Sequence, residues 1–129
     1  MSFLPHQSDN GLQPWEYYPA AAGEYKVGQM VNLTDGKLVP IAGVSTTTPQ
    51  FLCMASVALT EGQSLPVMRV THDMVFESQL SAEAADAKIG SKLQVSAGGL
   101  QVDAAATGTF CLTSIEDTAA GATVYGRFQ

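Results

Sequence analysis

The residues that could carry chemistry in this chain are few and lie far apart in the sequence. His72 stands beside Asp73, and a carboxylate next to an imidazole can orient that imidazole as a general base. The flanking residues are typical of a turn, where His and Asp serve as polar surface groups or caps. Proton-transfer catalysis needs a partnered site, and the sequence shows no partner for this pair. We therefore expect no catalytic residues and no enzymatic activity.

The two cysteines, Cys53 and Cys111, lie inside apolar segments. A reactive thiolate needs a cationic neighbourhood, which neither segment supplies, so both are expected to pack as small hydrophobic residues. Two cysteines do not make a disulfide framework and fit a reduced environment, although a single bridge between them stays open. The sequence lacks the Cys and His spacings of metal sites, a loop of regularly spaced acids and a phosphate-binding glycine loop. We expect no metal and no cofactor.

The two arginines, Arg69 and Arg127, each stand in a segment that is typical of a β-strand. Arginine is favoured at interfaces, but it also occurs as a solvated residue paired with a nearby acid, and both interpretations stay open. The net charge of −6 and the scattered positions of the six basic residues argue against nucleic acid as a partner. We also expect no membrane span and no signal peptide, because no apolar run has the required length or flanks.

The elements that must position these residues are predicted to be β-strands. Asp35-Gly36 accepts the positive φ angles of a tight hairpin between two alternating segments. No segment shows three turns of apolar helical spacing, so we expect little helix, at most one short turn over 81–86 with Ser81 as its cap. The alternation predicts a mostly buried core of Val31, Leu33, Phe51, Cys53, Val57, Val67, Leu93, Val95, Phe110, Ile115 and Val124.

An internal repeat is the most informative feature of the sequence. A shift of 62 positions carries Lys26-Val27-Gly28 onto Lys88-Ile89-Gly90, and a later shift of 58 carries Cys53 onto Cys111 and Arg69 onto Arg127. Each half, 24–70 or 86–128, holds too few strands for a core of its own. We therefore predict an all-β fold: a single domain over 23–129, built as a small β-barrel or β-sandwich from two similar halves in which these pairs superpose. The alternative is that common hairpin chemistry recurred by convergence.

Residues 1–22 differ from the rest of the chain. Three prolines disfavour helix there, and five of the ten aromatic residues lie within the first 25 positions. We predict an extended N-terminal arm that docks on a neighbouring chain, so that the body without residues 1–18 would stay folded. The open alternative is that the arm caps its own subunit. The predicted protein-interface residues are Phe3, Trp15, Tyr17, Tyr18, Arg69 and Arg127.

Several turn-and-strand motifs occur together in the remainder: Tyr25-Lys26-Val27-Gly28-Gln29-Met30-Val31, Pro66-Val67-Met68-Arg69-Val70, Asp73-Met74-Val75-Phe76-Glu77, Lys88-Ile89-Gly90-Ser91-Lys92 and Val124-Tyr125-Gly126-Arg127-Phe128. With these motifs, the stretch from Lys26 to Phe128 resembles a family of small phage and prophage head decoration proteins, also called capsid cement or capsid-stabilising proteins. The motifs are signatures of turns and strands and not a catalytic fingerprint.

The resemblance implies a structural protein of the virion that is made in the cytoplasm of the host bacterium. It would bind the major capsid protein on the outside of the mature shell, at three-fold or quasi-three-fold positions, often as a homotrimer. Such a protein has no small-molecule substrate and stabilises the shell because it binds only the assembled state. The alternative is a β-rich carbohydrate- or protein-binding module of a phage tail or fibre, in which Trp15, Tyr17 and Tyr18 form a stacking platform.

Overall fold

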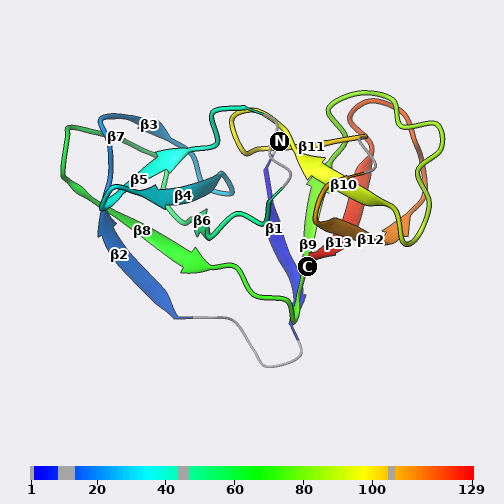
Figure 1. Ribbon diagram of the computed structural model, residues 1–129, viewed down its shortest axis with the longest axis horizontal. Coiled ribbons are helices and arrows are strands. Elements are labelled where there is room, and N and C mark those ends of the chain that lie inside the picture. Colours follow the sequence, from blue (N-terminus) through cyan, green and yellow to red (C-terminus); the bar gives the residue numbers. More distant parts are fainter. Residues whose placement is uncertain (1, 9–13, 44–46, 105–106) are drawn as a thin grey trace.

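The structure, a computed structural model, describes residues 2–8, 14–43, 47–104 and 107–129, and these residues form β-strands and no helix. The predicted all-β fold is confirmed (Figure 1). The short helical turn that the sequence allowed over 81–86 does not form: these residues form bends and turns. The Ser81 hydroxyl, the possible cap, donates to the Asp103 carboxylate, and the Ala84 N–H donates to the Thr118 carbonyl of another loop. No helix in the described part of the chain is long and apolar enough to cross a membrane. The strands are β1 (Leu4–Ser8), β2 (Trp15–Pro19), β3 (Gly23–Tyr25), β4 (Met30–Thr34), β5 (Lys37–Pro40), β6 (Phe51–Cys53), β7 (Val57–Leu59), β8 (Ser64–Arg69), β9 (Met74–Gln79), β10 (Lys92–Val95), β11 (Val102–Asp103), β12 (Phe110–Ile115) and β13 (Thr123–Phe128).

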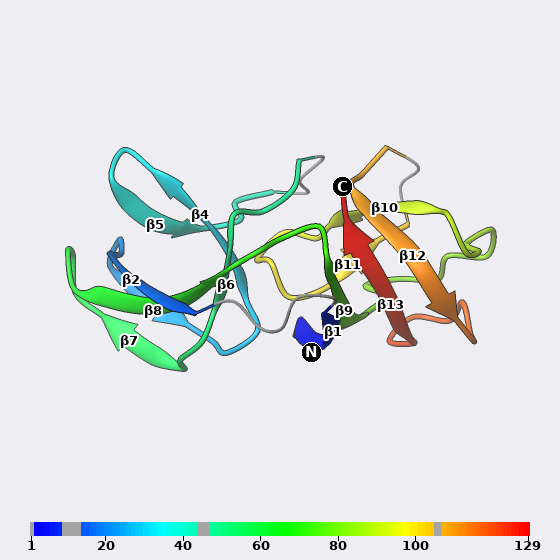
Figure 2. The same ribbon diagram turned by 90° about the horizontal axis from the view of Figure 1, so that it is seen from below.

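The strands form two lobes that lie side by side (Figures 1 and 2). The first lobe is a curled sheet of order β2-β8-β6-β4-β5 with the small ribbon β3-β7. The second lobe is a sheet of order β1-β9-β13-β12-β10-β11. A parallel bridge between Ala20 and Leu38 draws the two edges of the first sheet together. In the second sheet a parallel bridge joins Leu80, just after β9, to Val102 on the edge strand β11, so that β1 lies outside the closed part. Both lobes are therefore partly closed barrels.

The strand orders of the two lobes show the internal repeat directly. The order β8-β6-β4-β5 in the first lobe corresponds to β13-β12-β10-β11 in the second. In addition, β2 lies beside β8 as β9 lies beside β13, and both pairings are antiparallel. The repeated unit is thus longer than the halves 24–70 and 86–128, because it includes the strand that precedes each of them.

Hydrogen bonds set the register of the repeat and correct the predicted match of the cysteines. The Gly28 N–H donates to the Cys53 carbonyl, and at the equivalent place the Gly90 N–H donates to the Leu112 carbonyl. Cys53 therefore corresponds to Leu112, and Cys111 is one residue out of step. Because successive residues of a strand face opposite ways, the predicted superposition of Cys53 on Cys111 is wrong.

The arginines show the same offset of one residue. Arg69 pairs with Phe51 in the first lobe, and the equivalent pair in the second lobe is Phe128 with Phe110. The predicted superposition of Arg69 on Arg127 is therefore wrong as well. Equivalent residues of the two lobes are therefore identified by their place in the strand pairing and not by their residue type. A shift of one position would turn every side chain of a strand to the opposite face, so only shifts of two positions keep the same face buried.

We expect the two thiols to differ strongly in reactivity. Cys53 is fully buried, and burial raises the pKa of its thiol, whereas Cys111 is half-buried. In the native protein a disulfide reagent such as DTNB should modify Cys111 readily and Cys53 only on the timescale of unfolding, since the thiolate is the reactive form. A Cys111→Ser variant should lose the fast reaction alone. Equal rates for both thiols would contradict this assignment.

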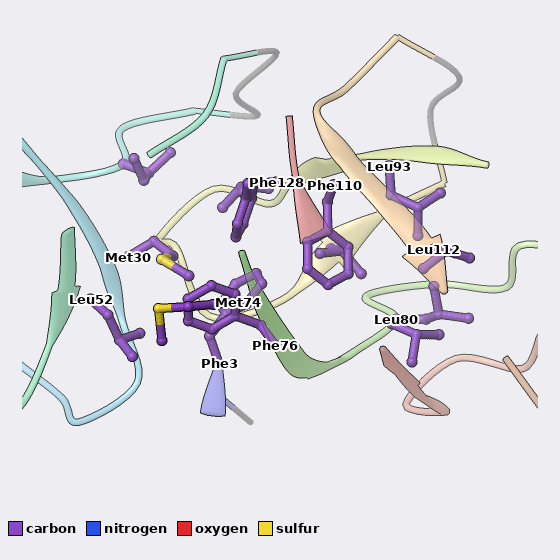
Figure 3. Close-up of a cluster of buried hydrophobic side chains, with 14 of the residues drawn as sticks. Phe3, Met30, Leu52, Met74, Phe76, Leu80, Leu93, Phe110, Leu112 and Phe128 are labelled. Carbon is purple, nitrogen blue, oxygen red and sulfur yellow. The ribbon is translucent and has the colours of Figure 1, made fainter. Parts of the chain in front are cut away.

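One large cluster of buried side chains joins the two lobes. The side chains of Met30, Leu52 and Met68 project from the outer face of the first sheet and belong to the same cluster as Phe76 and Phe128 of the second lobe. Figure 3 labels Met30 and Leu52 in this cluster. A second cluster fills the inside of the first lobe alone: Ala20, Tyr25, Val31, Leu38, Phe51, Cys53, Leu65 and Val67. The halves therefore stack head to tail, with the back of the first closing the inside of the second.

The outer face of the second sheet does not repeat this stacking surface. By the register of the pairs, Lys92, Cys111 and Arg127 occupy the places of the three residues that leave the outer face of the first sheet. Lys92 is exposed, and Cys111 and Arg127 are half-buried. The second lobe thus ends the stack with a more polar face, as terminal units of repeat proteins do.

Most of the predicted core is buried in the structure. Val31, Phe51, Cys53, Val67, Leu93, Val95, Phe110 and Val124 are buried, and Leu33 and Ile115 are half-buried. Val57 is 37% exposed, so the prediction that its side chain is buried was wrong. The reason is that Val57 lies on β7, in the small two-stranded ribbon, where a strand with a single partner has little to bury against.

The described residues of the arm are built into both lobes of their own chain. β1 pairs with β9 in the second sheet, and β2 pairs with β8 in the first. Phe3 is fully buried, and its backbone N–H donates to the Gly28 carbonyl at 2.8 Å. The prediction of Phe3 as an interface residue was therefore wrong, because its side chain is part of the protein's own core.

Candidate interaction surface

β2 is an edge strand that presents two large aromatic residues to solvent. Trp15 and Tyr17 alternate onto one face of the strand and are 52% and 63% exposed. On one side β2 is paired with β8. Just beyond its end, the Ala20–Leu38 bridge and the bond from the Ala21 N–H to the Leu38 carbonyl reach the other edge of the sheet. We call Trp15 and Tyr17 the aromatic edge.

The other face of β2 is fastened to the first lobe by a compact cluster. The Arg69 guanidinium donates from Nη2 to Glu16 Oε1 at 2.9 Å and from Nε to Glu16 Oε2 at 3.1 Å. The Tyr18 hydroxyl donates to the same carboxylate, and its ring packs on Phe51 with centroids 5.3 Å apart. Arg69 also lies over the Phe51 ring, 4.9 Å from its centroid. These contacts hold β2 in place, so the aromatic edge rests on a rigid strand.

The ionisation of this cluster follows from its hydrogen bonds. The bond from Arg69, with a further contribution from Tyr18, lowers the pKa of Glu16 below its ordinary value. The same carboxylate raises the pKa of the Tyr18 phenol, because the bond to Glu16 favours its protonated form. Arg69 is thus paired with a nearby acid, as one of its two open interpretations expects.

We expect Glu16→Gln to lower stability at neutral pH and not at acidic pH. A lowered folded-state pKa means that the ion pair stabilises the fold above the ordinary glutamate pKa of about 4.3, and that this contribution is lost as the pH falls through the lower folded value. Because Arg69 is half exposed, solvent screening limits the effect to about 0.2–1 kcal/mol. Urea unfolding at neutral pH and at about pH 3 measures it. The exposed control, Glu24→Gln, should change neither value, and a neutral-pH loss equal to that control would refute the assignment.

The remaining predicted residues lie elsewhere in the structure. Arg127 is on β13 in the second lobe, half-buried, and its Nη1 lies 3.5 Å from the His72 carbonyl oxygen. His72 is exposed, and its ring Nδ1 lies 2.9 Å from the Phe128 carbonyl oxygen. The structure therefore does not bring Arg127 together with the aromatic edge. Within the described residues, no group of three or more His, Cys, Asp or Glu side chains is placed to hold a metal ion.

A hollow in the second lobe was missed by the sequence analysis. Its volume is about 550 Å³, and it lies between the 83–87 segment and the start of β10. We call it the Ala87 hollow; its lining includes Glu83, Ala84, Asp86, Ala87, Lys92 and Leu93. The internal repeat contained a sequence feature at this place: the shift of 62 that carries Lys26 onto Lys88 also carries the large Tyr25 onto the small Ala87, which lines the hollow.

Three features stand out on the surface of the described residues: the aromatic edge, the ion pair of Arg69 with Glu16 behind it, and the Ala87 hollow on the other lobe. Exposed aromatic residues on a preordered scaffold are characteristic of binding surfaces. The comparisons add no identity to this description: no model of a known protein family matches the chain, and no curated protein sequence matches it significantly.

Proposed function

We propose that this chain is a structural, non-enzymatic protein that binds the outside of an assembled protein shell, namely the mature capsid of a tailed phage, and stabilises it. The observation that carries the proposal is the aromatic edge. Trp15 and Tyr17 leave about half or more of their surface in water while their strand is fixed from behind by the Arg69–Glu16 pair. Ordering such a surface on binding costs little entropy, so its apolar area contributes more fully to affinity.

The identity of the shell comes from the resemblance of the stretch Lys26–Phe128 to phage head decoration proteins. Such a protein would contact the major capsid protein, as a homotrimer at three-fold or quasi-three-fold positions on the outer surface of the virion. It would need no cofactor and no substrate. Its effect on the shell follows from mass action, because a ligand that binds only the assembled state stabilises that state.

The test is co-sedimentation with expanded capsids of the phage or prophage whose genome carries this gene. We expect binding by the intact protein and a rise in the temperature at which the capsids dissociate. A Trp15→Ser, Tyr17→Ser double variant should lose at least about 30-fold in affinity, as expected for hot-spot aromatic residues. Its own unfolding midpoint should hardly change, since both side chains are exposed.

The matched control is Ile89→Ser, which removes an even more exposed apolar side chain from a turn of the second lobe. It should bind capsids as the intact protein does. Failure of the intact protein to bind expanded capsids would refute the proposed function. Equal losses in the control and in the double variant would refute the role of the aromatic edge.

A second function is favoured by the same strand. Trp15 and Tyr17 lie on one face of a paired strand, so they form the kind of rigid platform on which sugar rings stack. A carbohydrate-binding module of a phage tail or fibre is therefore the alternative. Binding to a glycan array, abolished by the double variant and accompanied by no binding to capsids, would decide for it.

A further inference from the structure

The edge of β9 in the second lobe is covered by β1, a strand that has no counterpart in the first lobe. By the register of the repeat, Val67 of β8 corresponds to Gly126 of β13. Their partners Glu16 and Phe76 place β2 where the second lobe has β9. Among the described residues, β2 is the terminal strand of its sheet (Figure 1). The first lobe therefore leaves open the edge that β1 covers in the second lobe.

This free edge of β2 offers backbone groups of Trp15 and Tyr17 that no described strand pairs. Tyr17 stands opposite Pro66, which has no N–H and whose carbonyl accepts a bond from Met54 on the other side of β8. Tyr17 is therefore not bonded to β8, and its own N–H and carbonyl point to the free edge. Because these groups alternate between the two sides of a strand, those of Trp15 point the same way.

The open stretch is short and has a defined end. The next outward position after Tyr17 is Pro19, which has no N–H to offer. Two residues further on, the Ala21 N–H already donates to the Leu38 carbonyl at 2.9 Å. An added strand would therefore pair with the segment from Trp15 to Tyr17. Such a short edge limits uncontrolled pairing with other strands.

The side chains of the two equivalent strands show what an added strand would cover. Val75 of β9 takes the position of Trp15 and is buried, and it pairs with Gln7 of β1. Trp15 and Tyr17 are both exposed. Residues directly opposite each other share one face of a sheet, and aromatic residues pair well with β-branched ones. The added strand is therefore expected to carry β-branched apolar residues at the two alternate positions that face Trp15 and Tyr17.

A second copy of this chain fits the edge poorly. If two antiparallel β2 strands each used the backbone groups of Trp15 and Tyr17, Trp15 of one copy would lie opposite Tyr17 of the other. Glu16 would then lie opposite Glu16. Like charges directly opposite each other destabilise a strand pair, and both copies carry a net charge of −6. The edge is therefore better suited to a segment of a different protein.

We propose that the edge of β2 binds an extended segment of the capsid protein as an antiparallel strand, in the way that β9 binds β1. The backbone of this segment would exchange hydrogen bonds with Trp15 and Tyr17, and its β-branched side chains would cover the two rings. The inference deepens the proposed function, on which it rests for the identity of the partner. It goes beyond contact with the aromatic rings, because it assigns the backbone of β2 a part in recognition.

Two variants at one position separate the backbone from the side chain. Tyr17→Ser removes the ring and keeps the N–H, whereas Tyr17→Pro removes both. Both should fold, because proline is tolerated where the N–H of an edge strand faces solvent. Tyr17→Pro should bind expanded capsids at least about fivefold more weakly than Tyr17→Ser, since a carbonyl of the partner would be left without its donor. Equal binding by the two variants would overturn the proposal.

Amide hydrogen exchange in the unmodified protein makes the same test without a substitution. The protein is exposed to heavy water while bound to capsids, then released and examined by NMR. Exchange at the Trp15 and Tyr17 amides should be at least about tenfold slower than in the free protein. If Tyr17→Pro does not fold, this measurement decides, and unchanged exchange at both amides would overturn the proposal.

A peptide probe separates this inference from the function on which it rests. The blocked peptide lysyl-valyl-threonyl-valyl-lysine should give saturable shifts of the Trp15 and Tyr17 amides. The same peptide N-methylated at both valines should give none, because it lacks the donors that the edge requires.

If capsids bind the protein but the capsid measurements at β2 show no difference, the inference fails while the proposed function stands. If capsids do not bind, the peptide decides. Shifts with the unmethylated peptide alone would then leave the strand site in place without the proposed function, and equal behaviour of the two peptides would refute both.

Discussion

Phe3→Ala is expected to lower the free energy of unfolding by about 3–5 kcal/mol, the usual cost of truncating a fully buried phenylalanine. The Phe3 side chain is 0% exposed, and its ring lies 5.8 Å from that of Phe110 and 5.9 Å from that of Phe128. Removing it would open a cavity in the cluster that joins the two lobes (Figure 3). Urea unfolding followed by fluorescence and circular dichroism measures the loss.

The matched control is the next residue along the chain. Leu4 is 42% exposed on the opposite face of the strand, so Leu4→Ala should cost less than about 1 kcal/mol. Equal effects of the two substitutions would mean that the arm is not docked as the structure has it.

The body without residues 1–18 should not stay stably folded, contrary to the expectation from sequence. It would lose β1, β2 and the buried side chain of Phe3.

Gly108→Ala is expected to destabilise the protein by about 3 kcal/mol, at the upper end of overpacking costs. A Cβ atom on Gly108 would lie 1.8 Å from the Leu93 carbonyl oxygen and 2.2 Å from its carbon. Both atoms belong to backbone, which cannot rotate away as a side chain can. The start of β12 would have to separate from β10, whose pairing places Leu93 opposite Phe110.

Gly43→Ala provides the comparison for that substitution. Among the described residues beyond its chain neighbours, no atom lies within 4 Å of the Cβ position at Gly43, which is exposed. Its stability should therefore stay within about 0.5 kcal/mol of the unmodified protein. Thermal unfolding of both variants, scanned under the same conditions, checks the pair, and a Gly108→Ala midpoint equal to that of Gly43→Ala would contradict the tight approach of the two strands.

The two lobes and the arm form one mechanical unit. The arm contributes β1 to one sheet and β2 to the other (Figure 2). Side chains on the outer face of the first sheet pack into the core of the second lobe. A load on either lobe would therefore be transmitted through paired strands and a shared core. This arrangement suits a protein proposed to brace the subunits of a shell.

Local chemistry in the sequence determined the β-fold and its turns. The Asp35-Gly36 hairpin is present with φ angles of 51° and 81°, the positive values that only such residues adopt readily, and it joins Thr34 directly to Lys37 in the ladder. The repeat was also visible, because turn residues such as Gly28 and Gly90 are fixed by backbone conformation and therefore recur. These features depend on neighbours within a few positions.

Tertiary structure alone decided which aromatic residues are buried. The composition of the arm does not distinguish Phe3 from Tyr17, yet one is fully buried and the other is 63% exposed. Their fates depend on pairings with β9 and β8, strands about fifty to seventy positions away. The same register between distant strands places Cys111 one residue away from the position that is equivalent to Cys53. It also brings Ala87, which takes the position of Tyr25, to the lining of a hollow. No local pattern encodes a register between distant strands, because that register is set by which complete set of side chains can be buried together.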